Sequence, residues 1–363
     1  MPEKKAIPKG KSMRLFFLLL FSAVILCANL QAAPDDFFIP KTMTVLEERI
    51  PLENRAVYEM LEREIIISAC DRAQVLMWIK RSGRYFPHIE QALQKRSMPD
   101  DLKYLAVAES ALITHSLSTA GARGPWQFMK HTARQSGLRK NRLTDERLNF
   151  EQSTEAALNY LSRLHRRFNS WTLAAAAYNC GANRLYQSIQ EQKVTDYFRL
   201  NLPLETERYI YRIAAVKLIL EHPEKYGFHV SPERVYRPIP CDTVTVTIKT
   251  PLRISDITGN MAMDYKTLKE LNPQFTGDYL PAGKHRLKAP PGSGRELRQT
   301  ITAQAKSVLN RFKKYPGNMY TVQYGDTLGH ISERTGVPVR TLRRLNGIKG
   351  SLILAGQKLR LSP

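Results

Sequence analysis

The sequence is short of acidic residues. Of its 363 residues, 33 are Asp or Glu and 55 are Lys or Arg, which gives a formal net charge of +22. The first 33 residues hold five basic residues and one acidic residue, so a charge of +18 remains on the rest of the chain. A folded body this basic suits a polyanionic partner, such as nucleic acid, anionic lipid or a cell wall that carries carboxylates.

Cysteines and metal-binding motifs are also few. The chain has four cysteines and contains no HExxH or CxxC pair, so the common zinc motifs are excluded. Beyond Cys27, the sequence contains Cys70, Cys180 and Cys241, which allow at most one internal disulfide and leave a free or intermolecular thiol. We expect no metal ion and no cofactor.

Long hydrophobic runs are scarce, and one near the N-terminus predicts the compartment. The apolar segment Leu15–Ala28 follows a basic stretch and is shorter than the roughly 20 residues that span a bilayer. Small residues follow it, as in a signal peptide. We therefore expect residues 1–33 to be a signal peptide cleaved after Ala32, with export to the periplasm or cell envelope. An uncleaved membrane anchor is the alternative. Lipidation of Cys27 is not expected, because bulky residues precede it. Export argues against a nucleic-acid partner.

Residues Ser97–Leu112 predict a helix that carries an isolated carboxylate. Pro99 and the two aspartates after it are typical of a helix start, and aliphatic residues then recur at helical spacing. Glu109 shares the aliphatic face, where lost hydration raises the pKa of a carboxyl. The raised pKa favours the protonated carboxyl, which is the form that a general acid needs near neutral pH. A structural Glu paired with a distant Arg is the alternative, and the helix alone leaves both open.

The rest of the chain from Val45 to Tyr226 is predicted to be helical, with no strand. Residues 34–94 form a helical lead-in with a break at Gly83 and Pro87, and a helix restarts at Trp126–Met129 after a glycine-rich loop. Three further helices are expected at Phe150–Phe168, Trp171–Ala177 and Leu202–Ile219.

The pattern changes at Pro238. Residues 241–250 alternate as a strand does, and TLKELN at Thr267–Asn272 recurs as TLRRLN at Thr341–Asn346. Each copy begins and ends with a strand-like segment. We therefore predict two copies of a small βααβ module, at residues 241–290 and 319–363, joined by a basic linker and helix at residues 291–318.

Four short motifs occur in order along the helical region. They are Glu109-Ser110, GxxGPWQFM at Gly121–Met129, AYNCG at Ala177–Gly181 and ETERYI at Glu205–Ile210. Together they resemble the catalytic domain of the soluble-lytic-transglycosylase family, which has a goose-type-lysozyme-like fold. Residues Tyr320–Leu361 resemble a LysM peptidoglycan-binding module, and the first copy resembles a divergent LysM without the GDTL signature. The resemblance implies a multidomain protein with an all-α lysozyme-like catalytic domain at residues 95–235, followed by small α+β (βααβ) LysM modules.

The resemblance also implies roles for individual residues. It implies that Glu109 is the catalytic acid and base. Ser110 and Gln127 would hydrogen-bond the carboxylate or the sugar. Tyr178 and Asn179 would position the substrate. Tyr209 matches a tyrosine that steadies the glutamate. The LysM glycan groove would be formed by Gly325, Asp326, Thr327, Leu328, Leu352 and Ile353. The implied partner is the GlcNAc/MurNAc glycan strand of peptidoglycan.

The implied reaction is cleavage of the MurNAc-(β-1,4)-GlcNAc bond with formation of 1,6-anhydroMurNAc. Ordinary glycosidases need a second carboxylate. Besides Glu109, the acidic residues of the four motifs are Glu205 and Glu207. A single carboxylate suffices for a lytic transglycosylase. A lysozyme-type hydrolase and a non-catalytic wall-binding scaffold are the alternatives.

Overall fold

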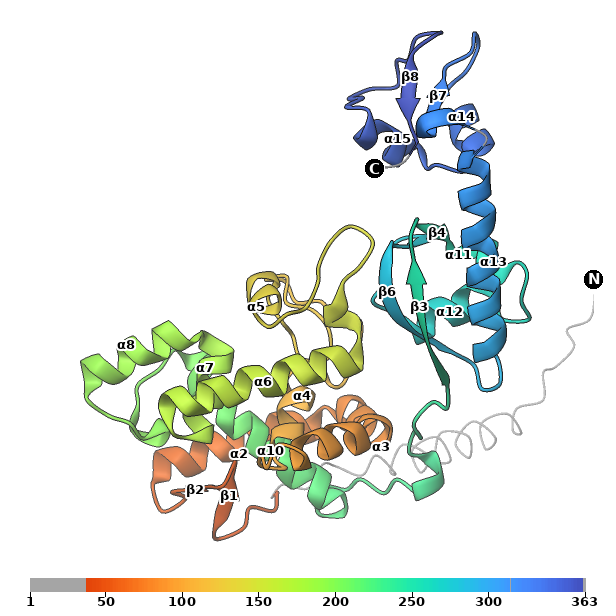
Figure 1. The fold of residues 1–363 in the computed structure, drawn as a ribbon. Helices are drawn as coiled ribbons and strands as arrows, with labels where there is room; N and C mark the ends of the chain where they lie inside the picture. The colour runs from red at the N-terminus through yellow and green to blue at the C-terminus, as the bar shows by residue number, and fades with distance from the viewer. Residues whose placement is uncertain (1–36, 314, 362–363) are drawn as a thin grey trace, which may run out of the picture.

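The computed structural model describes residues 37–313 and 315–361. A helical body is followed by two small modules that contain strand pairs, and a long helix runs from the first module to the second (Figure 1). The predicted signal peptide lies outside the described residues. Among the residues that are described, no helix is both long enough and apolar enough to cross a membrane.

The helical body contains nine α-helices among the described residues. They are α2 (Arg55–Cys70), α3 (Arg72–Gln94), α4 (Leu102–Ser110), α5 (Lys130–Gln135), α6 (Phe150–Phe168), α7 (Trp171–Cys180), α8 (Ala182–Gln192), α9 (Leu204–Glu207) and α10 (Tyr209–Glu221). Short 3₁₀ turns lie at η1 (Glu146–Leu148), η2 (Tyr197–Arg199), η3 (Pro223–Tyr226) and η4 (Pro232–Arg234). The predicted helix over Phe150–Phe168 is confirmed, and the helix predicted at Trp171–Ala177 extends to Cys180 as α7.

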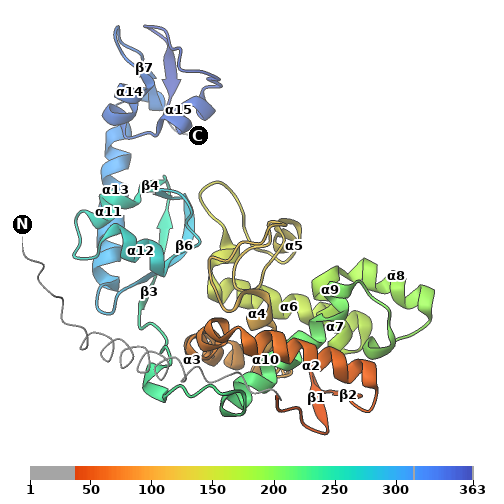
Figure 2. The same cartoon turned by 180° about the vertical axis from the view of Figure 1, so that it is seen from behind.

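Three helices form the centre of the helical body. Every residue of α4 from Leu102 to Val107 is buried, as is every residue of α7 from Thr172 to Ala177. The helix α10 buries most of its length and packs on both (Figure 2). Helices that are apolar on all sides need neighbours on all sides, so α2, α3 and α6 surround them.

The prediction that this region has no strand is wrong. Strands β1 (Met43–Val45) and β2 (Glu48–Ile50) form an antiparallel hairpin. Leu46 and Glu47 make its two-residue turn with φ values of 54° and 65°, the left-handed conformation that tight hairpins require. Neither residue type favours that conformation, so the turn carried no sequence signal.

The predicted break in the lead-in is also wrong, because α3 runs through both Gly83 and Pro87. A Cβ at Gly83 would lie 2.3 Å from Val235 Cγ1. The same segment donates the backbone N–H of Tyr236 to Lys80 O over 2.9 Å. Gly83 therefore allows a distant segment to pack closely on an intact helix rather than ending it.

Two smaller expectations differ from the structure. Residues Trp126–Met129 are not helical, and α5 begins at Lys130. The internal disulfide that the cysteine count allowed is not formed among the described residues, where Cys70, Cys180 and Cys241 are free thiols.

Both small modules have the predicted βααβ order. The first contains β3 (Asp242–Ile248), β4 (Leu252–Arg253), α11 (Ile254–Thr258), α12 (Tyr265–Leu271), β5 (Tyr279–Leu280) and β6 (Gly283–Ala289). The second contains β7 (Met319–Thr321), α14 (Leu328–Thr335), α15 (Val339–Leu345) and β8 (Lys358–Arg360), after the 3₁₀ turn η5 (Pro316–Asn318). In each module the outer strands pair antiparallel, β3 with β6 and β7 with β8.

The helix α13 (Gly294–Lys313) packs on the first module rather than standing apart from it. Leu297 and Ile301 enter that module's hydrophobic core. The backbone N–H of Gly294 donates to the carboxylate of Asp242 over 2.9 Å, which caps the helix on the strand β3.

The glycine-rich loop is held by a buried arginine. The Arg147 guanidinium donates to Gly121 O over 3.1 Å and to Phe128 O over 3.0 Å. Gly124 has a φ of +84°, and a Cβ there would lie 1.9 Å from Arg147 O. No side chain fits at this position.

We expect Gly124→Ala to lower the free energy of unfolding by about 2–4 kcal/mol, because the clash adds to the cost of a left-handed conformation. Gly121→Ala is the matched control, since Gly121 has a φ of +86° but open space around its Cβ position, and about 1–2 kcal/mol is expected there. Denaturant unfolding of the full chain measures both. Equal losses in the two variants would show that the contact with Arg147 contributes nothing.

Candidate active site

The helix α4 ends directly after Glu109 and Ser110. Ala111 and Leu112 follow with left-handed φ values of 52° and 60°, so the chain turns sharply instead of continuing to Leu112 as predicted. The Arg81 guanidinium donates to Ala111 O over 3.0 Å and holds this turn. Glu109 consequently lies in the last turn of a buried helix.

Burial sets the protonation state of Glu109. Its side chain keeps part of its surface open to solvent, but it is packed among buried residues of α4 and α10. This burial raises the pKa of Glu109 to about 7, against a hydrogen bond from Tyr209 and the charge of Arg212, which both favour the carboxylate. Near neutral pH the group therefore exists in both forms.

Tyr209 is the hydrogen-bond partner of that carboxyl. Its hydroxyl donates to Glu109 Oε1, and its side chain is fully buried at the start of α10. No Lys or Arg lies within ion-pair distance of Glu109 in residues 37–313 and 315–361. The alternative of a structural Glu paired with a distant Arg is therefore not what the structure contains.

Three of the candidate residues meet at the glycine-rich loop. Ser110 Oγ donates to Pro125 O over 2.8 Å, and the Tyr178 hydroxyl donates to Trp126 O over 2.7 Å. Gln127, with a φ of 44°, donates from Nε2 to Gly124 O over 2.8 Å. These bonds go to the loop backbone rather than to the Glu109 carboxyl, so Ser110 and Tyr178 position the loop beside it.

Asn179 lies at the end of α7 and is oriented by a residue of the ETERYI motif. Thr206 Oγ1 donates to Asn179 Oδ1 over 2.9 Å. This leaves the two N–H groups of the Asn179 amide available to a ligand. Burial raises the pKa of Tyr178, and the charge of Glu109 raises it further. The two side chains therefore lie close together.

Several residues that shape the site were not identified in the sequence. Arg212 acts on the charge of Glu109 from α10, Thr206 orients Asn179, and Arg81 holds the turn after α4. Helical spacing offered a signal for Arg212, which lies one turn after Tyr209. Nothing local indicated Arg81, because its partner is 30 residues away.

A second candidate site lies in the second module. A groove of about 440 Å³ lies between the start of α14 and the loop before β8, and five of the six predicted glycan-binding residues line it: Asp326, Thr327, Leu328, Leu352 and Ile353. Gly325 does not. Leu352 is 80% exposed and offers apolar surface to a sugar ring.

Two polar side chains of this groove, those of Asp326 and Thr327, form hydrogen bonds within the LysM domain. The Asp326 carboxylate accepts from the Tyr320 hydroxyl over 2.6 Å and pairs with Arg334 over 3.1 Å. Thr327 Oγ1 accepts from His330 N over 3.1 Å and caps α14. Arg343 was not predicted as a groove residue, yet it lines the groove and its buried Nε has no hydrogen-bond partner.

Comparison with known proteins identifies two domains. Residues 86–201 match the family model described as the transglycosylase SLT domain, and residues 320–362 match the LysM domain. The chain contains an SLT domain and a LysM domain. Glu109, Gln127, Tyr178 and Asn179 lie inside the SLT match, and Tyr209 lies beyond it. The predicted fold class, a mostly helical domain followed by small α+β modules, is confirmed.

The chain is similar to membrane-bound lytic murein transglycosylase D of Escherichia coli (strain K12), at 31% identity over 290 residues. This covers 77% of this chain and 63% of that protein, so the chain spans less than two thirds of its relative. A short stretch is 58% identical over 40 residues to an autolysin of Enterococcus faecalis, covering 11% of this chain and 5% of that protein. Among solved structures, the 70 kDa soluble lytic transglycosylase SLT70 of Escherichia coli matches with a TM-score of 0.35 and 18% identity, over 49% of this chain and 33% of that chain.

The raised pKa of Glu109 has a consequence for stability. An acid whose folded pKa of about 7 exceeds its ordinary value of 4.5 binds its proton more tightly in the folded state. Folding therefore loses stability as the pH rises from about 4.5 to 7, by about 3 kcal/mol in total. We expect Glu109→Gln to stabilise the chain at pH 8 by a similar amount and to have little effect at pH 4.

Denaturant unfolding at the two pH values measures this difference. Glu191→Gln, which changes an exposed glutamate of α8, is the control and should leave stability nearly unchanged at both. A Glu109→Gln effect of the same size at pH 4 and pH 8 would contradict the burial argument.

Proposed function

We propose that this chain is a lytic transglycosylase that cleaves peptidoglycan and is retained on the wall by its LysM domain. The observation that carries the proposal is a single carboxyl in a buried helix end, Glu109, with a pKa of about 7 and a Tyr209 hydroxyl donating to it. The SLT match and the name of the Escherichia coli relative support the same activity.

In the proposed reaction Glu109 acts first as acid and then as base. The protonated carboxyl gives its proton to the oxygen that links MurNAc C1 to GlcNAc, and the bond to C1 breaks. The N-acetyl group of the substrate stabilises the positive charge that develops at C1. The Glu109 carboxylate then takes the proton of the C6 hydroxyl of the same MurNAc, whose oxygen bonds to C1. The products are a 1,6-anhydroMurNAc end and a GlcNAc end, and no water is consumed.

A pKa near 7 suits both steps. An acid of much lower pKa would be ionised before it could protonate the leaving oxygen, and one of much higher pKa would be a strong base but a weak acid. Asn179, with its amide N–H groups available, and Gln127 on the glycine-rich loop would orient the sugar. Tyr209 would keep the carboxyl in one orientation through both proton transfers.

A lysozyme-type hydrolase is the second candidate. Glu205 is the observation that favours it, because its charge is close enough to raise the pKa of Glu109. In that case a second carboxylate could activate water or stabilise the charge at C1. A non-catalytic scaffold would keep the LysM groove and make no use of Glu109.

The LysM domain would bind GlcNAc-containing strands in the groove between α14 and the loop before β8. Backbone groups of Asp326 and Thr327 would contact N-acetyl groups, and Leu352 would pack on a sugar ring. We propose export to the periplasm or cell envelope, because the substrate lies there and the relative is named as membrane-bound. Cleavage of the signal peptide after Ala32 belongs to the same proposal, and membrane attachment through an uncleaved signal segment is its alternative.

Product analysis tests the reaction directly. Digestion of isolated sacculi should release muropeptides with anhydro ends, and Glu109→Gln should lower the rate by at least about 10²-fold. The rate should fall as the pH rises through about 7, because the acid form of Glu109 is lost. Reducing ends that depend on Glu205 would favour the hydrolase, and sacculi left undigested by the unaltered protein would favour the scaffold.

Deleting Tyr320–Pro363 tests the separation of roles. The truncated protein should sediment less with sacculi and lyse them more slowly, because a tethered weak binder raises the effective concentration of the substrate. Cleavage of short soluble glycan strands should be nearly unchanged. Loss of both activities together would mean that the LysM domain is needed for the catalytic fold.

A further inference from the structure

The first module (residues 242–289) is joined to the SLT domain by backbone hydrogen bonds. Asp145 N donates to Gln274 O over 2.7 Å, and Thr276 N donates to Leu143 O over 3.0 Å. Thr144 and Phe275 pair between these two bonds as an isolated antiparallel bridge. The loop after α5 therefore reaches across to the first module, as both views show (Figures 1 and 2).

The first module differs from the LysM domain in the segments that flank its helices. Its segments before α11 and before β6 pair with each other as β4 and β5, with Leu252 opposite Leu280 and Arg253 opposite Tyr279. In the LysM domain the residues at the start of α14 and residues 351–353 before β8 line the groove instead.

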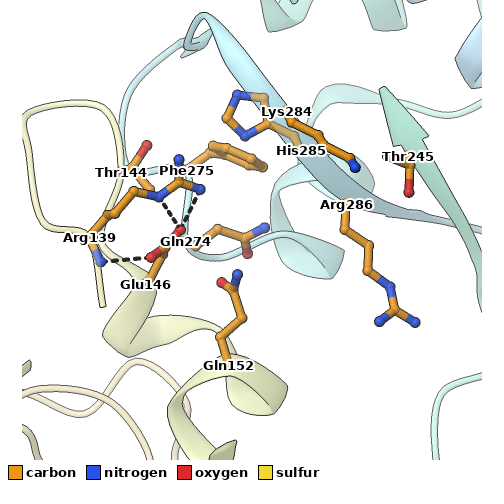
Figure 3. Close-up of a pocket in the computed structure, with 10 residues that line it drawn as sticks. All are labelled: Arg139, Thr144, Glu146, Gln152, Thr245, Gln274, Phe275, Lys284, His285 and Arg286. Atoms are coloured by element: carbon orange, nitrogen blue, oxygen red, sulfur yellow. Dashed lines mark hydrogen bonds and ion pairs between the residues drawn. The ribbon is translucent and has the colours of Figure 1, made fainter. Parts of the chain in front are cut away.

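A pocket of about 300 Å³ lies where the first module meets the SLT domain (Figure 3). This volume is at the lower end of the range for small-molecule sites. Arg139, Glu146 and Gln152 line it from the SLT domain, and Gln274, Lys284 and Arg286 line it from the module.

The charge of this pocket is positive. Arg139 neutralises Glu146. Its Nε donates to Glu146 Oε1 over 2.7 Å, and its backbone N–H donates to Glu146 Oε2 over 2.6 Å. Lys284 and Arg286 are exposed, and no carboxylate of the described chain lies within ion-pair distance of either. An anionic group could approach both.

The pocket also contains an unsatisfied buried amide. Gln274 is 5% exposed, and its Oε1 has no hydrogen-bond partner. Figure 3 shows its amide beside that of Gln152, facing the same space. An unpartnered buried carbonyl oxygen requires a hydrogen-bond donor, and the N–H of a ligand amide is one.

We propose that this pocket binds a carboxylate that is adjacent to an amide, with Lys284 and Arg286 holding the carboxylate and Gln274 accepting from the amide N–H. The inference rests on the proposed function, since peptidoglycan carries this chemistry in its acidic stem peptides and, where the peptide has been removed, in the lactyl carboxylate of MurNAc beside its N-acetyl group.

Binding to the full chain tests the proposal, with Glu109→Gln present so that nothing is cleaved. The probes are a free acidic stem tetrapeptide and a peptide-free MurNAc–GlcNAc oligomer. Lys284→Gln and Arg286→Gln should each weaken binding of the tetrapeptide by about tenfold or more. Arg253→Gln, which removes an exposed arginine of the same module outside the pocket, is the matched control and should change nothing.

A loss confined to the oligomer would identify the lactyl carboxylate as the ligand and would still support the pocket. Equal affinities of both probes for the starting protein and the two pocket variants would overturn the proposal. Failure of the proposed function is distinguishable: sacculi would then yield no anhydro ends, while the tetrapeptide would still bind in a manner that depends on Arg286.

Discussion

A buried ion pair between Asp145 and Arg147 holds three parts of the molecule together. Asp145 is fully buried, and Arg147 contacts both of its carboxylate oxygens over 2.9 Å. Burial alone would raise the pKa of Asp145, but the bonds from Arg147 outweigh it and the pKa is lowered. Arg147 also fixes the glycine-rich loop at Gly121 and Phe128, while the backbone of Asp145 pairs with Gln274 of the first module. Removing one partner of such a pair costs about 3–5 kcal/mol, so loop and module depend on it together.

This arrangement connects the candidate catalytic centre to the first module. The loop that Arg147 holds accepts hydrogen bonds from Ser110 and Tyr178 on its backbone, and these residues lie beside Glu109. Thr144 and Glu146, in the segment that carries Asp145 and Arg147, line the pocket at the module. A ligand in that pocket therefore rests on the chain segment that supports the loop at Glu109.

Local patterns were sufficient for much of the helical body. The aliphatic spacing after Pro99 predicted the helix of Glu109 and its burial, and the amphipathic pattern of Phe150–Phe168 predicted α6 with its bounds. Alternation predicted β3, and the repeat of TLKELN predicted two modules of the same order. These signals work because each element's own residues determine which face is buried.

The failures have a common cause in partners that are distant in sequence. Gly83 was expected to end a helix, but it makes room for Val235, about 150 positions later. Leu46 and Ala111 adopt left-handed conformations that their residue types do not favour, because surrounding contacts fix them. No local pattern indicates that the loop at Asp145 pairs with Gln274. This pairing, and the pocket that it creates between the two domains, result from packing between segments distant in sequence.

The pairing of β4 with β5 in the first module affects how long the proposed enzyme would stay on a glycan strand. With β4 and β5 paired, the first module does not form the kind of groove that the LysM domain has between the start of α14 and the loop before β8. A glycan strand held by one shallow groove dissociates quickly, since affinity of this kind is set mainly by the dissociation rate. Two open grooves would lengthen the residence time, because a strand released by one groove would still be held by the other. Under the proposed function, the chain would therefore leave a strand soon after a cut and sample many strands in turn.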